Sequence, residues 1–218
     1  MNEFARGVAF IFEGPTECVF YFSVLEHYLS KHEDYKITKE FDRRTNDYIY
    51  IISNNTKAVI VMAFTVGTVI AHTQASANWF RNNCKHHHKQ IDWTVFLCYD
   101  TDSHSKDVSQ FQEGDWKELK KSIKKNKRTS IIDLAASADI EDTMLLDIDG
   151  VCGFLGIPLC PIPPGRKGKS KMKKIFRENN SCYHEGERAK PLIDYLNKDI
   201  IISKSSISFN DIDKACFT

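Results

Sequence analysis

The feature that most constrains the fold is an almost wholly apolar run of strand length, residues 7–12, with a helical pattern directly behind it. Glu13 ends the run, and Gly14 and Pro15 form the turn. Pro15 suits the first position of a helix, where its missing N–H removes no hydrogen bond. We therefore expect a strand over residues 7–12, buried on both faces, and a helix over residues 15–30. Glu13 then lies at the carboxyl end of the strand, where open α/β sheets bind ligands.

The rest of the chain alternates between strand-like and helical patterns. Strand-like runs occupy residues 48–52, 58–64, 93–99 and 130–134, and helical patterns occupy residues 67–84, 116–125, 172–176 and 187–197. This alternation predicts a mainly parallel sheet flanked by helices. The first two runs either pair as a hairpin or form one core strand and one edge strand. Residues 31–46 are polar and weakly patterned, and a polar tail follows residue 197.

Length and composition favour a single domain with a substantial core. The chain has 218 residues, of which 42% are apolar, and its 14 Phe supply large buried volume. We expect an α/β core over residues 1–150, with a basic loop and a helical C-terminal extension over residues 151–218 packed on it. The net charge of +1 excludes a polybasic binder, so any nucleic-acid contact has to come from a local patch.

The cysteines and the hydropathy pattern predict a cytoplasmic protein. The seven cysteines are scattered, without a Cys-x-x-Cys pair, as free thiols of a reducing compartment are. The N-terminus lacks the basic-then-apolar layout of a signal peptide. No apolar run approaches the roughly 20 residues of a membrane span, so no membrane partner is expected.

Acidic residues recur at the ends of the predicted strands. Glu13 ends the first strand, Asp100 and Asp102 end the strand over residues 93–99, and Glu141 and Asp142 follow a third strand. The carboxyl ends of parallel strands share one edge, so these carboxylates are expected to converge. Clustered carboxylates stay ionised together only with a cation between them. Oxygen ligands suit Mg²⁺ or Mn²⁺ rather than zinc, and such an ion activates water for attack on phosphorus.

A basic loop is the second chemical signal. Residues 166–174 hold six cations, and the candidate phosphate contacts are Arg166, Lys167, Lys169 and Lys171. Lys169 or a neighbour is expected to steady a scissile phosphate. Plainer interpretations remain open, since a lysine run is more often a solvated face. Three histidines at residues 86–88 suggest zinc, but they sit at a predicted helix end, where cations are favoured.

Several short motifs together resemble a known family. The sequence Phe-Glu-Gly-Pro-Thr-Glu at residues 12–17, followed much later by Asp-x-Asp at residues 100–102, resembles the Toprim domain of topoisomerases, primases and OLD-type nucleases. It is most similar to the RloB-like branch found among bacterial defence genes. That branch also has a Glu before a Leu-rich helix start, a Lys-rich loop containing Gly, and a Tyr-x-x-Gly turn. Matching segments here are residues 140–146, 167–176 and 183–186.

The resemblance spans about residues 8–197 and implies a Toprim-like core with an acidic metal site. It implies that Glu13, Asp100 and Asp102 bind metal, that Glu141 is a further ligand, and that a lysine of residues 167–171 contacts phosphate. The first motif is one residue shorter here, and residues 31–76 match nothing in the family. Position 142 is acidic where the branch has a bulky residue, so either Glu141 or Asp142 is the ligand. Glu17 is either a second-metal ligand or a partner of the helix dipole.

These observations lead to an expected function. It is an Mg²⁺-dependent nuclease that hydrolyses phosphodiester bonds in DNA or RNA as an effector of anti-phage defence, with Glu13, Asp100, Asp102 and Lys169 as catalytic residues. The alternative is a non-cleaving Toprim-fold subunit that binds nucleotide or nucleic acid and regulates a defence ATPase. A primase-like polymerase is a weaker alternative, because no zinc-binding module is recognisable. The resemblance makes an ATPase partner plausible, and a homo-oligomer is left open.

Overall fold

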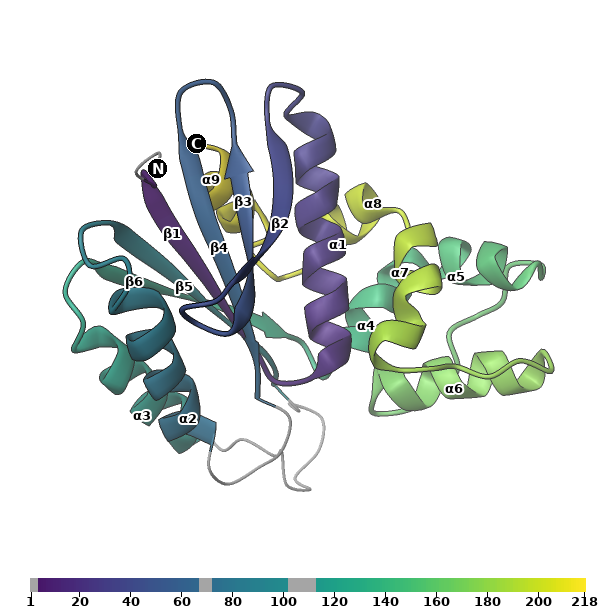
Figure 1. The fold of residues 1–218 in the computed structure, drawn as a ribbon. Coiled ribbons are helices and arrows are strands. Elements are labelled where there is room, and N and C mark those ends of the chain that lie inside the picture. Colours follow the sequence, from purple (N-terminus) through teal and green to yellow (C-terminus); the bar gives the residue numbers. More distant parts are fainter. Residues whose placement is uncertain (1–3, 67–71, 102–112) are drawn as a thin grey trace.

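The computed structural model describes residues 4–66, 72–101 and 113–218 (Figure 1). Within them the chain forms a six-stranded sheet of order β2-β3-β4-β1-β5-β6. The strands are β1 (Arg6–Phe12), β2 (Lys36–Asp42), β3 (Asp47–Ser53), β4 (Ala58–Thr65), β5 (Asp92–Asp100) and β6 (Thr129–Ala136). β1 pairs in parallel with β4 and β5, and β5 with β6, whereas β2–β3 and β3–β4 are antiparallel. The prediction of an α/β fold with a mostly parallel sheet is confirmed.

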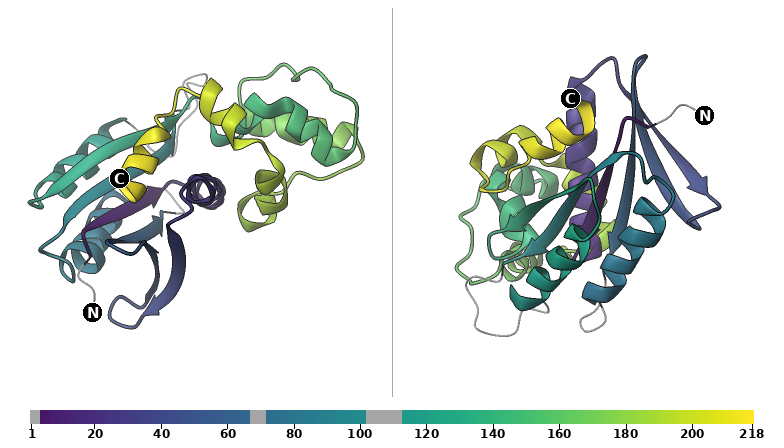
Figure 2. Two further views of the ribbon diagram at one scale, coloured as in Figure 1. Left: turned by 90° about the horizontal axis from the view of Figure 1, so that it is seen from above. Right: turned by 90° about the vertical axis from the view of Figure 1, so that its left-hand side faces the viewer.

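Helices cover both faces of the sheet. They are α1 (Pro15–Lys31), α2 (His72–Trp79), α3 (Glu113–Lys124), α4 (Ile140–Met144), α5 (Ile148–Leu155), α6 (Gly168–Glu178), α7 (Lys190–Tyr195), α8 (Lys198–Lys204) and α9 (Asn210–Phe217). Three segments of other helical types adjoin them: the π-helix η1 (Phe80–Lys85) and the 3-10 turns η2 (Leu145–Asp147) and η3 (Gly186–Ala189). Figures 1 and 2 show α2 and α3 on one face, α1 and α9 on the other, and α4 to α7 grouped to one side.

β1 is the centre of the fold because both of its faces are buried. Val8, Phe10 and Phe12 join the hydrophobic cluster under α1, while Ala9 and Ile11 join the cluster under η1 and α3. Successive side chains of a strand point to opposite faces, so a strand covered twice needs the continuous apolar run seen in the sequence.

β3 and β4 form the hairpin that was one of two predicted alternatives. The sequence did not predict β2, which lies at the edge of the sheet within the weakly patterned residues 31–46. Most of its residues are exposed. An edge strand that is solvated on both faces carries little of the apolar alternation by which strands are recognised.

The predicted polar tail folds into α8 and α9 instead. Ile201, Ile212 and Phe217 are buried in the same hydrophobic cluster as α1. The hydroxyl of Tyr35 donates a hydrogen bond of 2.6 Å to the carbonyl of Phe217. Short helices with one apolar turn each give too little periodicity to stand out from a polar segment.

Two further observations bear on the sequence predictions. All seven cysteines are free thiols. In the part of the chain that the structure describes, no helix has the length and apolar character needed to cross a bilayer.

Candidate metal and catalytic site

The carboxyl ends of β1 and β5 bring two predicted acids together at the lower edge of the sheet in Figure 1. The backbone N–H of Glu13 donates to the carbonyl of Cys98 over 3.0 Å, which extends the β1–β5 pairing by one residue. The N–H of Asp100 then donates to Oε2 of Glu13 over 3.1 Å. The parallel ladder therefore places both carboxylates side by side, although 87 residues separate them.

The segment after β6 adds further carboxylates to this edge. Ala138 adopts the left-handed backbone conformation (φ 64°), and its N–H donates to Oγ1 of Thr101 over 3.1 Å. This conformation costs an Ala residue about 1 kcal/mol, and strain of this kind is concentrated at functional sites. The turn allows Asp139 to cap α4 by accepting from the N–H of Asp142 over 2.9 Å. It also places Glu141 in the first turn of α4, only 4% exposed.

Glu17 enters the cluster from α1 and is 7% exposed. The N-terminus of α1 is held by a hydrogen bond of 2.9 Å from the N–H of Gly186 to Oγ1 of Thr16. Glu17 packs so closely on Gly14 that a Cβ there would lie 2.8 Å from Oε2 of Glu17. Burial raises the pKa of Glu17 to about 7, and the charge on Glu13 adds to this rise.

The acids at this edge strongly oppose each other's ionisation. We call them the acid cluster, and they are Glu13, Glu17, Asp100, Asp139 and Glu141. Burial raises the pKa of Asp100 to about 10, and the charges on the neighbouring acids add to the rise, namely those on Glu17, Glu13, Asp139 and Glu141. Burial and the charge on Asp139 also raise the pKa of Glu141 to about 7. Oδ1 of Asp100 is buried and has no hydrogen-bond partner among the described residues. A cation between the carboxylates would remove the repulsion and satisfy this oxygen.

The donor set fits a hard divalent ion. Every candidate donor is a carboxylate oxygen, which is the ligand type that Mg²⁺ and Mn²⁺ prefer. Within residues 4–66, 72–101 and 113–218, no three Asp, Glu, His or Cys side chains form a ready-made metal cage. Asp102, the other member of the Asp-x-Asp pair, lies outside the described residues. The unpartnered oxygen of Asp100 therefore carries the argument for a metal at this edge.

Glu141 and Asp142 have different surroundings, which bears on the choice left open by the sequence. The carboxylate of Asp142 accepts from Nζ of Lys171 over 2.6 Å and from the N–H of Gly168 over 2.9 Å. Oε1 of Glu141 accepts from the hydroxyl of Tyr183 over 2.9 Å, and its charge acts on Asp100. Asp142 thus holds α6 in place, whereas Glu141 belongs to the acid cluster.

Among the four predicted phosphate contacts of the basic loop, Lys169 lies beside the acid cluster. Its Nζ forms an ion pair of 2.5 Å with Oε2 of Glu185. Burial works against the charged form of Lys169, but the contact with Glu185 and the charges on Glu141 and Glu17 outweigh it and raise the pKa. The backbone N–H of Lys169 also donates to Oδ2 of Asp139 over 3.1 Å. This lysine is therefore fixed to the site at both its backbone and its side chain.

The other predicted cations of the loop have different roles. Lys171 is paired with Asp142. Lys167 precedes α6, and its carbonyl accepts from the N–H groups of Ser170 and Lys171 over 3.1 and 3.2 Å. Arg166 is exposed. Of the four basic residues that the sequence grouped together, Lys171 is thus paired with Asp142 and Lys169 with Glu185.

Sequence reasoning missed four residues of the site. They are Thr16, Asp139, Tyr183 and Glu185. Asp139 carried a recognisable signal, since Asp directly before a helix start is a common cap. Tyr183 and Glu185 lie in the Tyr-x-x-Gly segment, which carried a resemblance but no assigned role. The histidines at residues 86–88 lie between η1 and β5, and His87 and His88 line a cleft together with Asp42 and Arg44.

A scan against protein-family models gives no match to this chain, and a search of curated proteins gives none either.

Proposed function

We propose that this protein is an Mg²⁺-dependent nuclease that hydrolyses phosphodiester bonds in nucleic acid. One observation carries the proposal: Asp100 holds a buried, unpartnered carboxylate oxygen next to Glu13, at the sheet edge where other acids converge. A site of this kind binds a divalent cation through oxygen ligands. Phosphoryl chemistry is the reaction class that such ions most directly support.

The residues divide into ligands and positioning groups. Glu13 and Asp100 would hold the ion, with Glu141 as a further ligand. Tyr183 donates to Glu141 and so orients it, as outer hydrogen bonds orient metal ligands in general. When bound, the ion polarises a phosphate oxygen and lowers the pKa of a water molecule.

Glu17 is the candidate proton carrier. Its pKa of about 7 allows its carboxylate to accept a proton from the attacking water at neutral pH. Glu13 is the alternative general base if it does not bind the ion. Lys169 supplies positive charge beside these acids, where it can contact the phosphate and stabilise the charge that develops on it.

The motifs that resemble RloB-like Toprim proteins extend the proposal to biological context. On that resemblance we propose a Toprim-type effector in anti-phage defence, with an ATPase as a partner. A non-cleaving regulatory subunit of such an ATPase is the competing proposal. It would use the same acids to bind a metal ion or nucleotide without hydrolysis.

Cleavage assays separate these two proposals. Purified protein, with and without a co-expressed ATPase, is incubated with single-stranded and duplex DNA and RNA in Mg²⁺, Mn²⁺ or EDTA. We expect cleavage that requires the metal and is lost in Glu13→Gln. The control variant is Glu118→Gln, an exposed carboxylate of α3 that is paired with Lys121. Metal binding without cleavage of any substrate would contradict a nuclease and support the regulatory subunit.

A further inference from the structure

An exposed aromatic pair lies on the β2–β3 hairpin. Phe41 and Tyr48 are directly opposite each other in the antiparallel register, and each is 51% exposed. Their ring centroids lie 5.4 Å apart in an edge-to-face arrangement. Nζ of Lys39 lies 4.4 Å from the ring centroid of Tyr48 and 5.4 Å from that of Tyr50. We call Lys39, Phe41, Tyr48 and Tyr50 the hairpin patch.

The patch is anchored on the hydrophobic core. The ring of Tyr50 packs on Phe22 of α1, with centroids 4.7 Å apart. Phe22 in turn contacts Phe10 and Phe12 of β1. The two exposed rings therefore extend from a rigid base, so little conformational freedom is lost when a flat partner stacks on them.

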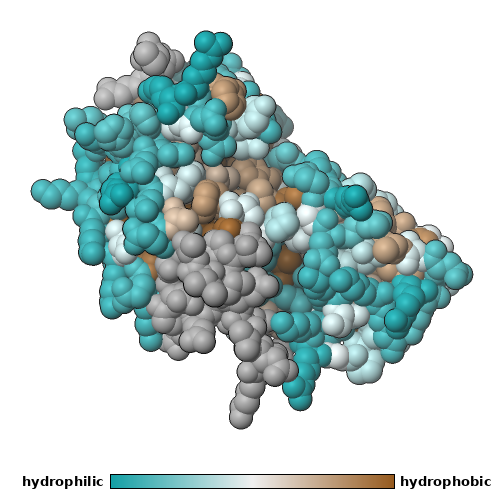
Figure 3. All heavy atoms as spheres, turned by 60° about the horizontal axis from the view of Figure 1, so that its bottom comes forward, coloured by the Kyte–Doolittle hydropathy of each residue, from teal (hydrophilic) through white to brown (hydrophobic). Residues whose placement is uncertain are grey.

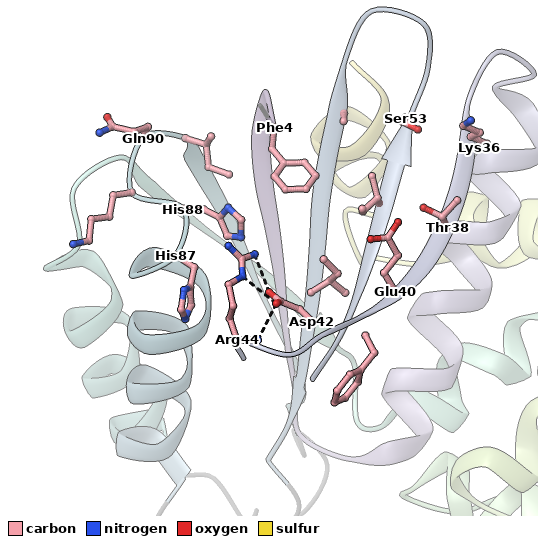
Figure 4. A pocket seen from close by; sticks show the side chains of 16 residues that line it. Phe4, Lys36, Thr38, Glu40, Asp42, Arg44, Ser53, His87, His88 and Gln90 are labelled. Atoms are coloured by element: carbon pink, nitrogen blue, oxygen red, sulfur yellow. Dashed lines mark hydrogen bonds and ion pairs between the residues drawn. The ribbon is translucent and has the colours of Figure 1, made fainter. Parts of the chain in front are cut away.

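The acidic residues of β2 point away from the patch. Figure 4 shows Glu40, Asp42 and Arg44 directed into a cleft of about 860 Å³ beside the hairpin. Phe41 is the member of the patch that also lines this cleft. Arg44 neutralises Asp42 through two hydrogen bonds of 3.0 Å. Because neighbouring side chains of a strand alternate between faces, the patch carries Lys39 without an adjacent carboxylate of β2. It is therefore both aromatic and positively charged.

The patch lies toward the same edge of the sheet as the acid cluster. β3 runs antiparallel to β4, so the start of β3 and the end of β2 lie beside the carboxyl ends of β4 and β1. Strands are about 4.8 Å apart, which places Tyr48 roughly 10 Å from β1 across the sheet. Lys39 also acts electrostatically on Cys18, in the first turn of α1 next to Glu17. Figure 3 looks onto this edge and shows hydrophobic side chains there, bordered by hydrophilic ones.

We propose that the hairpin patch stacks the unpaired bases of a single-stranded nucleic acid and leads the strand to the acid cluster. Unstacked bases expose flat faces, which aromatic rings bind regardless of sequence, whereas a duplex hides them. Lys39, together with exposed Arg43 in the turn, provides the contact with phosphate. A site size of about 4 to 16 nucleotides is enough to span the patch and the acids. The inference names the substrate class of the proposed nuclease and rests on that proposal.

The test measures binding separately from cleavage. The Asp100→Asn protein in EDTA is titrated into fluorescently labelled single strands of DNA and of RNA, each about 12 nucleotides long, and into a duplex of the same length. Fluorescence anisotropy gives the Kd. Tyr48→Thr and Phe41→Thr remove one ring each and put a β-branched residue, which favours strands, in its place, and circular dichroism checks folding. Tyr48→Phe keeps the ring, Lys39→Gln removes only the charge, and Tyr195→Thr alters an aromatic residue of α7 that is 57% exposed.

We expect the protein to bind a single strand more tightly than the duplex. Its preference between DNA and RNA single strands then identifies which of the two is the natural substrate. Loss of one ring should weaken single-strand binding roughly tenfold. Tyr48→Phe should bind more tightly than Tyr48→Thr because it keeps the ring, and Tyr195→Thr should leave the affinity unchanged. Lys39→Gln should weaken binding and reduce its salt dependence. The inference would be overturned if Tyr48→Thr and Phe41→Thr bound the single strand as tightly as the Asp100→Asn protein without a ring substitution. The same result is expected if a protein partner, and not nucleic acid, covers this hairpin. Cleavage by the Asp100→Asn protein would contradict the proposed function and leave the binding result intact.

Discussion

The backbone N–H of Asp100 donates a hydrogen bond of 3.1 Å to Oε2 of Glu13, across the boundary between two parallel strands. The bond ties the position of the Glu13 carboxylate to the backbone of β5. It leaves Oδ1 of Asp100 buried and without a hydrogen-bond partner among the described residues. Two acids held together in this way are costly for a protein without a cation.

The first prediction concerns pH and metal removal. The pKa of Glu17 is raised from its usual 4.5 to about 7 in the folded chain, so the folded state binds this proton more tightly than the unfolded state. Its contribution to stability is present at low pH and is lost as the pH rises from about 4.5 to 7. In EDTA, the free energy of unfolding should therefore fall between pH 5.5 and 8, by about 2 kcal/mol from this carboxyl alone. Urea unfolding at the two pH values measures the change.

The matched variant for this prediction is Glu17→Gln, which cannot ionise. The free energy of unfolding of this variant should fall less between the two pH values than that of the parent protein. The difference between the two falls is the contribution of Glu17. Saturating Mg²⁺ should reduce the decline in the parent protein, because an ion that binds only the folded state stabilises it. The raised pKa of Glu17 would be contradicted if the stability of the parent protein in EDTA rose over this pH range. It would also be contradicted if the stability of Glu17→Gln fell as much as that of the parent protein.

The second prediction tests the close approach of α6 to α4. A Cβ on Gly168 would lie 2.1 Å from the backbone N of Asp142 and 2.5 Å from Oδ1 of Asp139. Gly168→Ala should therefore separate the basic loop from the acids and destabilise the protein by about 2 kcal/mol. Gly165→Ala is the control, since its Cβ would make an ordinary contact of 3.4 Å with Lys171. Equal unfolding midpoints in urea for these two variants would show that the helices are not packed as described.

The third prediction tests Tyr183 as a positioning residue. Tyr183→Phe removes only the hydroxyl that donates 2.9 Å to Oε1 of Glu141. We expect Mn²⁺ affinity to fall about tenfold, as is typical when an outer hydrogen bond to a metal ligand is removed. The pKa of Glu141 should rise further, since this hydrogen bond lowers it. Titration calorimetry measures the affinity, and Tyr195→Phe controls for loss of a hydroxyl elsewhere; unchanged affinity in Tyr183→Phe would count against this role.

The fourth prediction separates Glu141 from Asp142. Glu141→Gln should abolish metal-dependent cleavage, whereas Asp142→Asn should retain most of it. Asp142→Asn should instead lower stability by about 1–3 kcal/mol, because the carboxylate binds Lys171 and the N–H of Gly168. Cleavage rates and urea midpoints of both variants provide the comparison. The reverse result, with Asp142 essential and Glu141 dispensable, would mean that Asp142 is the ligand.

The sequence predicted those parts of the fold that depend on continuous burial. The strand containing Val8 and the helix starting at Pro15 both formed where expected, because one is buried on both faces and the other is rich in large apolar residues that pack into the core. β2 was missed because an exposed edge strand carries no such pattern. α8 and α9 were missed because each is short, and their burial depends on docking against α1 rather than on local periodicity.

The sequence predicted those residues of the candidate site whose positions follow from the ends of strands. Glu13 and Asp100 meet because both end parallel neighbours, and this follows from topology. The roles of Asp142 and Lys171 did not follow, because their mutual ion pair depends on how α6 folds back on α4. Tyr183 was likewise invisible as a partner of Glu141, since 42 residues separate them.

Cleavage by Asp100→Asn tests the central claim most directly. Asn is nearly isosteric with Asp and keeps the backbone N–H that contacts Glu13, so the variant should fold. In EDTA at neutral pH it should be at least as stable as the parent protein, because a neutral side chain removes the repulsion between the acids. The single-turnover rate on a labelled oligonucleotide in saturating Mg²⁺ should fall by about a thousandfold or more, while Glu118→Gln cleaves at the parent rate. A folded Asp100→Asn protein that cleaves as fast as the parent would contradict the metal-dependent mechanism at this site.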